Sequence, residues 1–148
     1  KRSDISYCNS SHTQDILKLI YNLNTSIFYT GFIPYLNRTI PNKLNKNYEY
    51  DYAIIVSSFK RKIKNTEQSL KELLKINHKS KILLVGRELK QSSPDIYDKL
   101  YNKNNLIIEY HEHLDNKTIL NYYPKIKNIM QHSHYESCSN VMLEGLFR

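Results

Sequence analysis

The sequence predicts an α/β fold in which a parallel sheet is covered by helices on both faces. From residue 51 onward, apolar runs of strand length alternate with segments of helical spacing. Two of these runs, residues 52–56 and 82–85, are apolar throughout, as in strands that are buried on both faces. Strands that alternate with crossover helices pair in parallel. We therefore expect a Rossmann-like, doubly wound sheet.

The length and composition are those of one folded domain. The chain has 148 residues, of which 40% are hydrophobic and 24% charged, which is typical of a globular protein with its own core. No apolar stretch is long enough to span a bilayer, and the polar start lacks a signal-peptide pattern. Two cysteines, Cys8 and Cys138, indicate free thiols in a reducing compartment. We expect a cytoplasmic protein and, because the chain starts without Met and stops within a helical pattern, a piece of a longer one.

The charge balance is basic, with a formal net charge of +8. Such a balance suits nucleic acid, an anionic membrane surface or a phosphate-bearing substrate. It also follows from an AT-rich genome, whose coding enriches Lys, Asn, Ile and Tyr throughout a chain, and Ala occurs only once, at Ala53. The net charge alone therefore does not choose among these partners.

Residues 1–50 are expected to be a segment or linker that leads into the main domain. Residues 5–8 form a short β-like run, and residues 11–24 carry apolar side chains at the spacing of one helix face. Residues 26–29 fit a second short strand. A glycine, two prolines and several Asn in residues 31–50 indicate a loop.

Residues 51–148 are expected to form the main domain. Pro94 in a first turn and Asp115 as a cap mark two of its helix starts. The expected strands are residues 52–56, 81–86, 106–110 and 126–131, and the expected helices are residues 66–76, 93–100, 115–123 and 139–147. Ligands of such sheets bind beyond the carboxyl ends of the strands. The loops at 57–65, 86–92, 111–115 and 132–140 should therefore surround one crevice.

Two of these loops carry chemistry that suits a nucleoside diphosphate. The first is basic and contains Lys60, Arg61, Lys62 and Lys64, which would neutralise a diphosphate. In the last loop, Ser139 is suited to cap a helix, so that the amides after it would form an anion site. Glu144 lies just over one turn further and could accept hydrogen bonds from a ribose, while Glu136 would face the crevice. Together these residues predict a site for a nucleoside diphosphate sugar.

The segment from Ser133 through Glu136 to Glu144-Gly145 resembles the E-x7-E signature of retaining glycosyltransferases of family 4. The order of three other segments also follows this family: Val85-Gly86, residues 106–114 and Tyr122-Tyr123. The resemblance covers residues 51–148. It implies a GT-B arrangement of two Rossmann-like domains, of which this chain is most of the second, the donor-binding domain, truncated within the signature helix.

The resemblance also implies roles for individual residues. Catalytic roles fall to Glu136, at the donor sugar hydroxyls, and to Lys64 and Arg61, at the leaving diphosphate. The implied donor-binding residues are Ser137, Cys138, Ser139, Asn140, Val141, Glu144, Gly86, His113 and Leu114, with the backbone at 112–114 around the base. The family places its arginine nearer the strand end, where Ser57 and Ser58 stand, so Lys60 or Lys62 could replace Arg61.

The resemblance also implies which donor and acceptor the protein uses and whether it needs a cofactor. The donor would be a UDP- or GDP-sugar, used in glycan biosynthesis with retention of configuration and without a metal or other cofactor. The acceptor, a glycan, lipid or protein, would be bound through an N-terminal domain that this chain lacks. The isolated chain is therefore expected to transfer sugar poorly.

Other functions remain open at this point. A basic nucleic-acid-binding module would use Lys and Tyr, but the chain lacks the RNP, helix-turn-helix and zinc patterns, so no nucleic acid partner is expected. A domain that binds a nucleotide sugar but has no catalytic activity would have the same sequence features as an active donor-binding domain. Association with a membrane surface also stays open. The histidines at 111, 113, 132 and 134 lack zinc spacing, so no metal site is expected.

Overall fold

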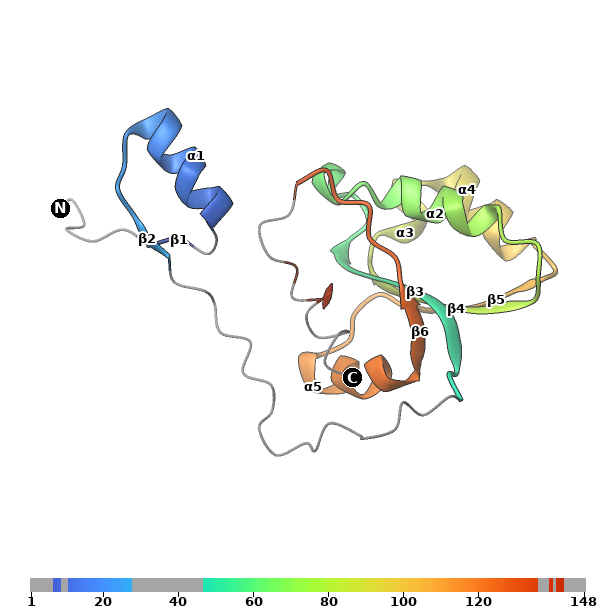
Figure 1. The fold of residues 1–148 in the computed structure, drawn as a ribbon. Helices are drawn as coiled ribbons and strands as arrows, with labels where there is room; N and C mark the ends of the chain where they lie inside the picture. Colours follow the sequence, from blue (N-terminus) through green and yellow to red (C-terminus); the bar gives the residue numbers. More distant parts are fainter. Residues whose placement is uncertain (1–6, 9–10, 28–46, 136–138, 140, 143–148) are drawn as a thin grey trace.

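The computed structural model describes residues 7–8, 11–27, 47–135, 139 and 141–142 (Figure 1). Near the start of the chain, β1 (Tyr7–Cys8) and β2 (Ser26–Ile27) pair in parallel, with α1 (Ser11–Tyr21) between them. Both strands and the helix were expected, and α1 ends three residues earlier than predicted. Most of the predicted linker lies outside the described residues.

The main domain is built on a four-stranded sheet whose strands are all parallel. The strands are β3 (Tyr50–Ser58), β4 (Ser80–Arg87), β5 (Leu106–His111) and β6 (Ile126–Ile129). Their order across the sheet is β5-β4-β3-β6. This is the order 3-2-1-4 of a doubly wound sheet, so the predicted Rossmann-like α/β fold is confirmed.

Helices cover both faces of the sheet (Figure 1). One face carries α2 (Thr66–Leu74), α3 (Leu89–Ser92) and α4 (Pro94–Tyr101), and the other carries α5 (Asn116–Tyr122). Two short 3-10 turns, η1 (Lys62–Lys64) and η2 (Tyr123–Lys125), precede α2 and follow α5. Asp115 caps α5 as predicted, because its side chain accepts a hydrogen bond from the Thr118 amide. Among the described residues, no helix has the length and apolar character needed to cross a membrane.

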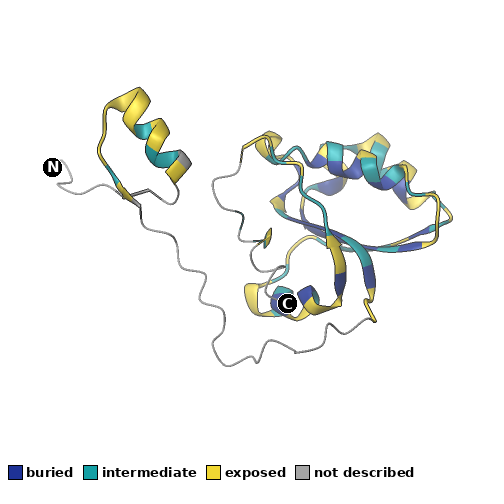
Figure 2. Ribbon diagram, in the orientation of Figure 1, coloured by how far each residue is buried: buried dark blue, intermediate teal, exposed yellow. Residues whose placement is uncertain are grey.

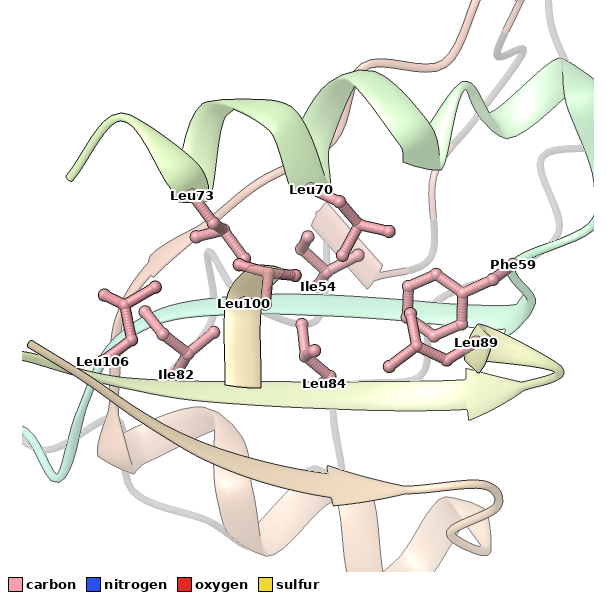
Figure 3. Close-up of a cluster of buried hydrophobic side chains, with 9 residues drawn as sticks. All are labelled: Ile54, Phe59, Leu70, Leu73, Ile82, Leu84, Leu89, Leu100 and Leu106. Carbon is pink, nitrogen blue, oxygen red and sulfur yellow. The ribbon is translucent and has the colours of Figure 1, made fainter. Parts of the chain in front are cut away.

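Alternating residues of the central strands belong to two separate cores. Figure 2 shows that the buried residues gather on the strands and on the helices that cover them. On the face under α2 and α4, Ile54, Ile82 and Leu84 pack against side chains of those helices (Figure 3). On the α5 face, the neighbouring strand residues Ala53 and Leu83 are fully buried. Both faces of β3 and β4 are therefore buried, which explains why these strands are apolar throughout.

The connections between the strands create a point where the chain changes direction across the sheet. From β3 the chain moves to β4 and then to β5, with its helices on one face. From β5 it returns through α5, on the other face, to β6 on the far side of β3. The strand order reverses between β3 and β6, and in sheets of this kind a crevice lies at the carboxyl ends of such a pair of strands.

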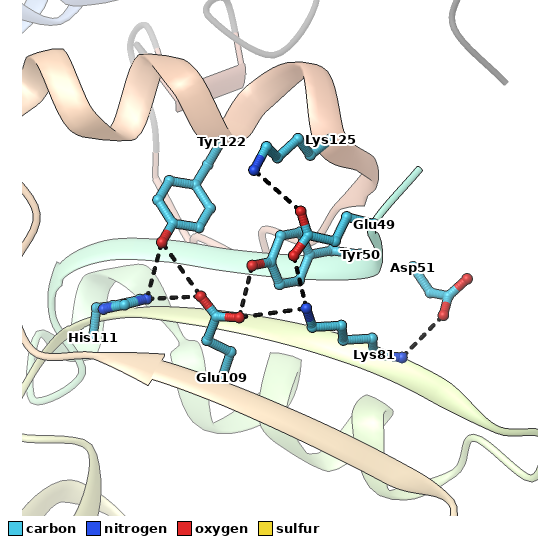
Figure 4. A network of polar contacts seen from close by, with 8 residues as sticks. All are labelled: Glu49, Tyr50, Asp51, Lys81, Glu109, His111, Tyr122 and Lys125. Atoms are coloured by element: carbon cyan, nitrogen blue, oxygen red, sulfur yellow. Dashed lines mark hydrogen bonds and ion pairs between the residues drawn. The ribbon is translucent and has the colours of Figure 1, made fainter. Parts of the chain in front are cut away.

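A polar network lies on the α5 face of the sheet (Figure 4). Glu109 of β5 accepts hydrogen bonds from the Tyr50 hydroxyl at 2.7 Å and the Tyr122 hydroxyl at 3.3 Å. Lys81 of β4 forms ion pairs with Glu49 at 2.8 Å and with Glu109 at 3.5 Å. Burial, followed by the bond to Glu109, raises the pKa of Tyr50, so this hydroxyl stays neutral and donates. The network therefore ties β3, β4 and β5 to α5.

This network is expected to weaken in acid. Hydrogen bonds from Lys81 and Lys125 lower the pKa of Glu49 to about 2. The Glu49 carboxylate therefore stabilises the folded state above the ordinary unfolded-state pKa of about 4.3, and this contribution is lost as the pH falls toward 2. The urea concentration at the unfolding midpoint should be lower at pH 3 than at pH 7. This decrease should be smaller for Glu49→Gln than for the wild type. Glu67→Gln, which removes only a surface pair with Lys71, should keep the wild-type pH dependence. An unchanged pH dependence in Glu49→Gln would contradict this expectation.

Candidate functional site

Two cavities open at the carboxyl end of β3. The first has a volume of about 240 Å³ and lies between β3, the loop that follows it and the segment after β6. The second has a volume of about 630 Å³ and lies between the ends of β3 and β4 and the segment after β5. Both are lined by Ile55, Val56, Ser57 and Val141. We call the two cavities together the crevice, and these shared residues lie at its centre.

The crevice gathers every described residue of the site that was expected from the sequence. Arg61, Lys64 and Ser139 line the first cavity, Gly86, His113 and Leu114 line the second, and Val141 lines both. Glu136, Ser137, Cys138, Asn140 and Glu144 lie outside the described residues. The ends of β3 and β4 and the segments that follow β3, β5 and β6 therefore contribute to one crevice.

The ends of β3 and β4 are irregular where they border the crevice. The pairing register of the two strands shifts between Ile55 and Ser58, as at a β-bulge. Gly86 of β4 has a φ of +148°, and a Cβ at this position would lie 2.6 Å from the Val56 carbonyl oxygen. Glycine therefore allows the two backbones to approach closely at the crevice.

The loop after β3 presents two cations to the first cavity. Phe59 anchors the start of this loop in the core, and its carbonyl accepts a hydrogen bond from the Thr66 hydroxyl at 2.9 Å. Between these anchors, Arg61 and Lys64 line the cavity. Arg61 Nη1 also donates a hydrogen bond to Ser57 Oγ at 3.3 Å. The Arg61 guanidinium therefore lies at the end of β3, although its backbone lies further along the loop.

Lys60 and Lys62, the alternatives to Arg61, do not line either cavity of the crevice. Lys60 forms an ion pair of 3.0 Å with Glu88, which also accepts a hydrogen bond of 2.6 Å from the Ser58 hydroxyl. Ser58 and then Lys60 lower the pKa of Glu88, so its carboxylate stays charged. Both lysines instead line a neighbouring groove between the β3 loop and the start of α4. Among the described residues of the basic loop, Arg61 and Lys64 are therefore the cations of the crevice.

The last loop is held in place by polar side chains. Ser139 Oγ accepts a hydrogen bond from the Met142 amide at 3.3 Å, which is the geometry of the predicted helix cap. The same hydroxyl donates to Gln131 Oε1 at 2.7 Å. The His134 amide donates to the Ile63 carbonyl at 2.9 Å, which joins this loop to the basic loop. Most of the helix predicted after Ser139 lies outside the described residues.

The histidines contact protein groups rather than forming a cluster. His132 shares a hydrogen bond of 2.9 Å with the buried Ser69 hydroxyl, and His111 contacts Glu109 at 3.0 Å. In the part of the chain that the structure describes, no three His, Cys, Asp or Glu side chains are placed to hold a metal ion.

Arg87 is a further cation of the crevice, and its place there was not predicted from the sequence. This residue is the last of β4 and lines the second cavity. Its Nε donates a long hydrogen bond of 3.4 Å to the Ser57 carbonyl. The sequence did show a basic residue directly after the glycine that ends a buried strand. Whether the side chain of that residue points into the crevice depends on how the strand ends, which the sequence does not show.

Comparisons of this chain with models of protein families, with curated proteins and with solved structures found no match. An assignment of function therefore depends on the crevice, on the residues that line it and on the motif in the last loop. The fold determines where the crevice lies but not what it does, because doubly wound sheets host many unrelated reactions.

Proposed function

We propose that this chain is a donor-binding domain of a retaining glycosyltransferase and binds a nucleoside diphosphate sugar in the crevice. The observation that carries the proposal is the convergence of Arg61 and Lys64 on a crevice at the switch point of a doubly wound sheet. A pair of cations on one side of a site suits a diphosphate better than a single phosphate or a neutral sugar.

The shape of the crevice suggests how the ligand lies. The larger second cavity is lined by His113, Leu114, Ile119 and Tyr123, a mixture that suits a base and a pentose. The first cavity contains Arg61 and Lys64 and would take the distal phosphate and the sugar. The diphosphate would then cross the centre of the crevice, beside the Ser57 hydroxyl.

In the proposed reaction, the bond between the anomeric carbon of the sugar and the distal phosphate breaks, and its electron pair remains on the phosphate. An oxygen of the acceptor forms the new bond to that carbon, and the proton of its hydroxyl passes to the departing phosphate. Lys64 and Arg61, which line the first cavity, would offset the negative charge that develops there. The resemblance to family 4 adds Glu136 at the sugar and Glu144 at the ribose. Since Arg61 reaches Ser57, it can serve the position at the strand end where that family carries its arginine.

The acceptor would enter from a second domain in the GT-B arrangement. The chain alone is therefore expected to bind the donor without transferring sugar at a normal rate. This property makes binding, rather than turnover, the measurement that tests the proposal.

The proposal predicts that UDP or GDP raises the melting temperature of the chain. At about 100 times the dissociation constant, a ligand stabilises the folded state by about 2.7 kcal/mol, which corresponds to about 5–10 °C for a chain of this size. Lys64→Ala and Glu144→Ala should reduce this shift. Lys79→Ala, which removes an exposed cation at the amino end of β4, should keep it.

Two results would contradict the proposal. One is the absence of a shift with any nucleoside diphosphate. The other is salt-dependent binding of DNA without protection by nucleotides, which would favour a basic nucleic-acid-binding module.

A further inference from the structure

Arg87 occupies an unusual stretch of backbone at the edge of the crevice. The residue before it, Gly86, has a φ of +148°, and the residue after it, Glu88, has a φ of +66°. A positive φ costs energy for a residue such as Glu and persists only where the surrounding structure holds it. Here Ser58 and Lys60 hold the Glu88 side chain at 2.6 Å and 3.0 Å. The strand end therefore turns sharply around Arg87, and the carboxylate next to it is engaged with other groups.

Two arginines, one from the loop after β3 and one from the end of β4, meet at one residue. Arg61 donates to the Ser57 side chain at 3.3 Å, and Arg87 donates to the Ser57 carbonyl at 3.4 Å. Arg61 lines the first cavity and Arg87 the second, while Ser57 lines both. The two guanidinium groups thus flank the centre of the crevice from opposite sides.

The charges around the second cavity restrict where an anion fits. Among the described residues that line this cavity, Glu112 is the acid and Arg87 the permanent cation. An anion would be repelled near Glu112 and attracted near Arg87, which lies at the Ser57 end of the cavity. That end adjoins the first cavity, where Arg61 and Lys64 lie.

We infer that Arg87 binds the phosphate nearest the nucleoside, whereas Arg61 and Lys64 bind the distal phosphate. This assignment rests on the proposed function. It makes Arg87 the residue that recognises nucleoside monophosphates and diphosphates alike, and it makes Lys64 the residue that distinguishes between them. A planar guanidinium can donate two parallel hydrogen bonds to one phosphate, which suits Arg87 to this task.

The test is isothermal titration of the full chain with UDP, UMP and uridine, and with the three guanosine equivalents. Arg87→Gln should weaken binding of the monophosphate and the diphosphate by about tenfold each and leave nucleoside binding unchanged. Lys64→Gln should weaken diphosphate binding by about tenfold and change monophosphate binding by less than about twofold. Lys79→Gln is the matched control for the loss of one exposed positive charge, and it should bind all the ligands as the wild type does.

The outcomes distinguish a failure of the role assigned to Arg87 from a failure of the proposed function. If Arg87→Gln binds the monophosphate as the wild type does, or if the wild type binds the diphosphate but not the monophosphate, the role of Arg87 is overturned while the proposed function stands. If the wild type binds no nucleotide, the proposed function fails and the role of Arg87 fails with it. Arg87→Lys keeps the charge but not the paired donors, so it should bind the monophosphate more tightly than Arg87→Gln does. Circular dichroism of each variant checks that it is folded.

Discussion

Gly86→Ala is expected to lower the free energy of unfolding by about 2–6 kcal/mol. The new Cβ would lie 2.6 Å from the Val56 carbonyl oxygen and 2.9 Å from Val56 Cγ2, and alanine rarely adopts a φ of +148°. Backbone strain contributes about 1–3 kcal/mol and overpacking about 1–3 kcal/mol. Urea unfolding followed by far-ultraviolet circular dichroism measures the loss. Because Gly86 also lines the crevice, nucleotide binding should weaken in the same variant.

A double variant separates the two sources of this effect. Val56→Ala removes the side-chain atom of the clash but leaves the carbonyl oxygen in place. Adding it to Gly86→Ala should therefore restore only a minor part of the stability. A Gly86→Ala variant as stable as the wild type, or one fully rescued by Val56→Ala, would show that the backbones of β3 and β4 do not approach closely at this point.

Leu84→Ala is expected to lower the free energy of unfolding by about 2–5 kcal/mol. Leu84 lies at the middle of β4 and is fully buried among Ile54, Phe59 and Leu89 on the helix-covered face (Figure 3). Truncation removes apolar contacts and leaves a cavity, because the neighbouring strands on both sides limit relaxation. Urea unfolding at pH 7 provides the measurement.

Ile107→Ala is the matched control for this substitution. Ile107 has a side chain of the same size on the neighbouring strand β5, but 49% of its surface is exposed. Its truncation should cost less than about 1 kcal/mol. Equal losses in the two variants would contradict the placement of the core between the sheet and α2.

The sequence was sufficient to predict the architecture because both faces of the central strands are buried. Such strands show as unbroken apolar runs, and β3 and β4 do so at residues 52–56 and 82–85. The start of β3 was missed, because Tyr50 lies between two acids and is buried only through α5 and its bond to Glu109. The four-residue helix α3 was also missed, since it buries a single side chain, Leu89, and shows no period.

The sequence predicted which loops border the site, but not which side chains of those loops point into it. Residues that closely follow strands, such as His113 and Leu114, lie at the carboxyl edge of the sheet and line the crevice there. Lys60 and Arg61 are neighbours in the sequence, but only the folded loop shows that one pairs with Glu88 and the other reaches Ser57. Arg87 depends in the same way on the turn at Gly86, which is a tertiary feature of two strands rather than a local pattern.

The central claim is that the crevice binds a nucleoside diphosphate, and a nuclear magnetic resonance titration tests it most directly. Heteronuclear spectra of the full chain would be recorded with increasing UDP and, separately, GDP. We predict that one of the two shifts the backbone amides of Ser57, Arg61, Lys64, Arg87 and His113 in a saturable way, while the amides at the amino ends of the strands stay in place. Unchanged spectra with both nucleotides, or saturable shifts confined to residues outside the crevice, would contradict the claim.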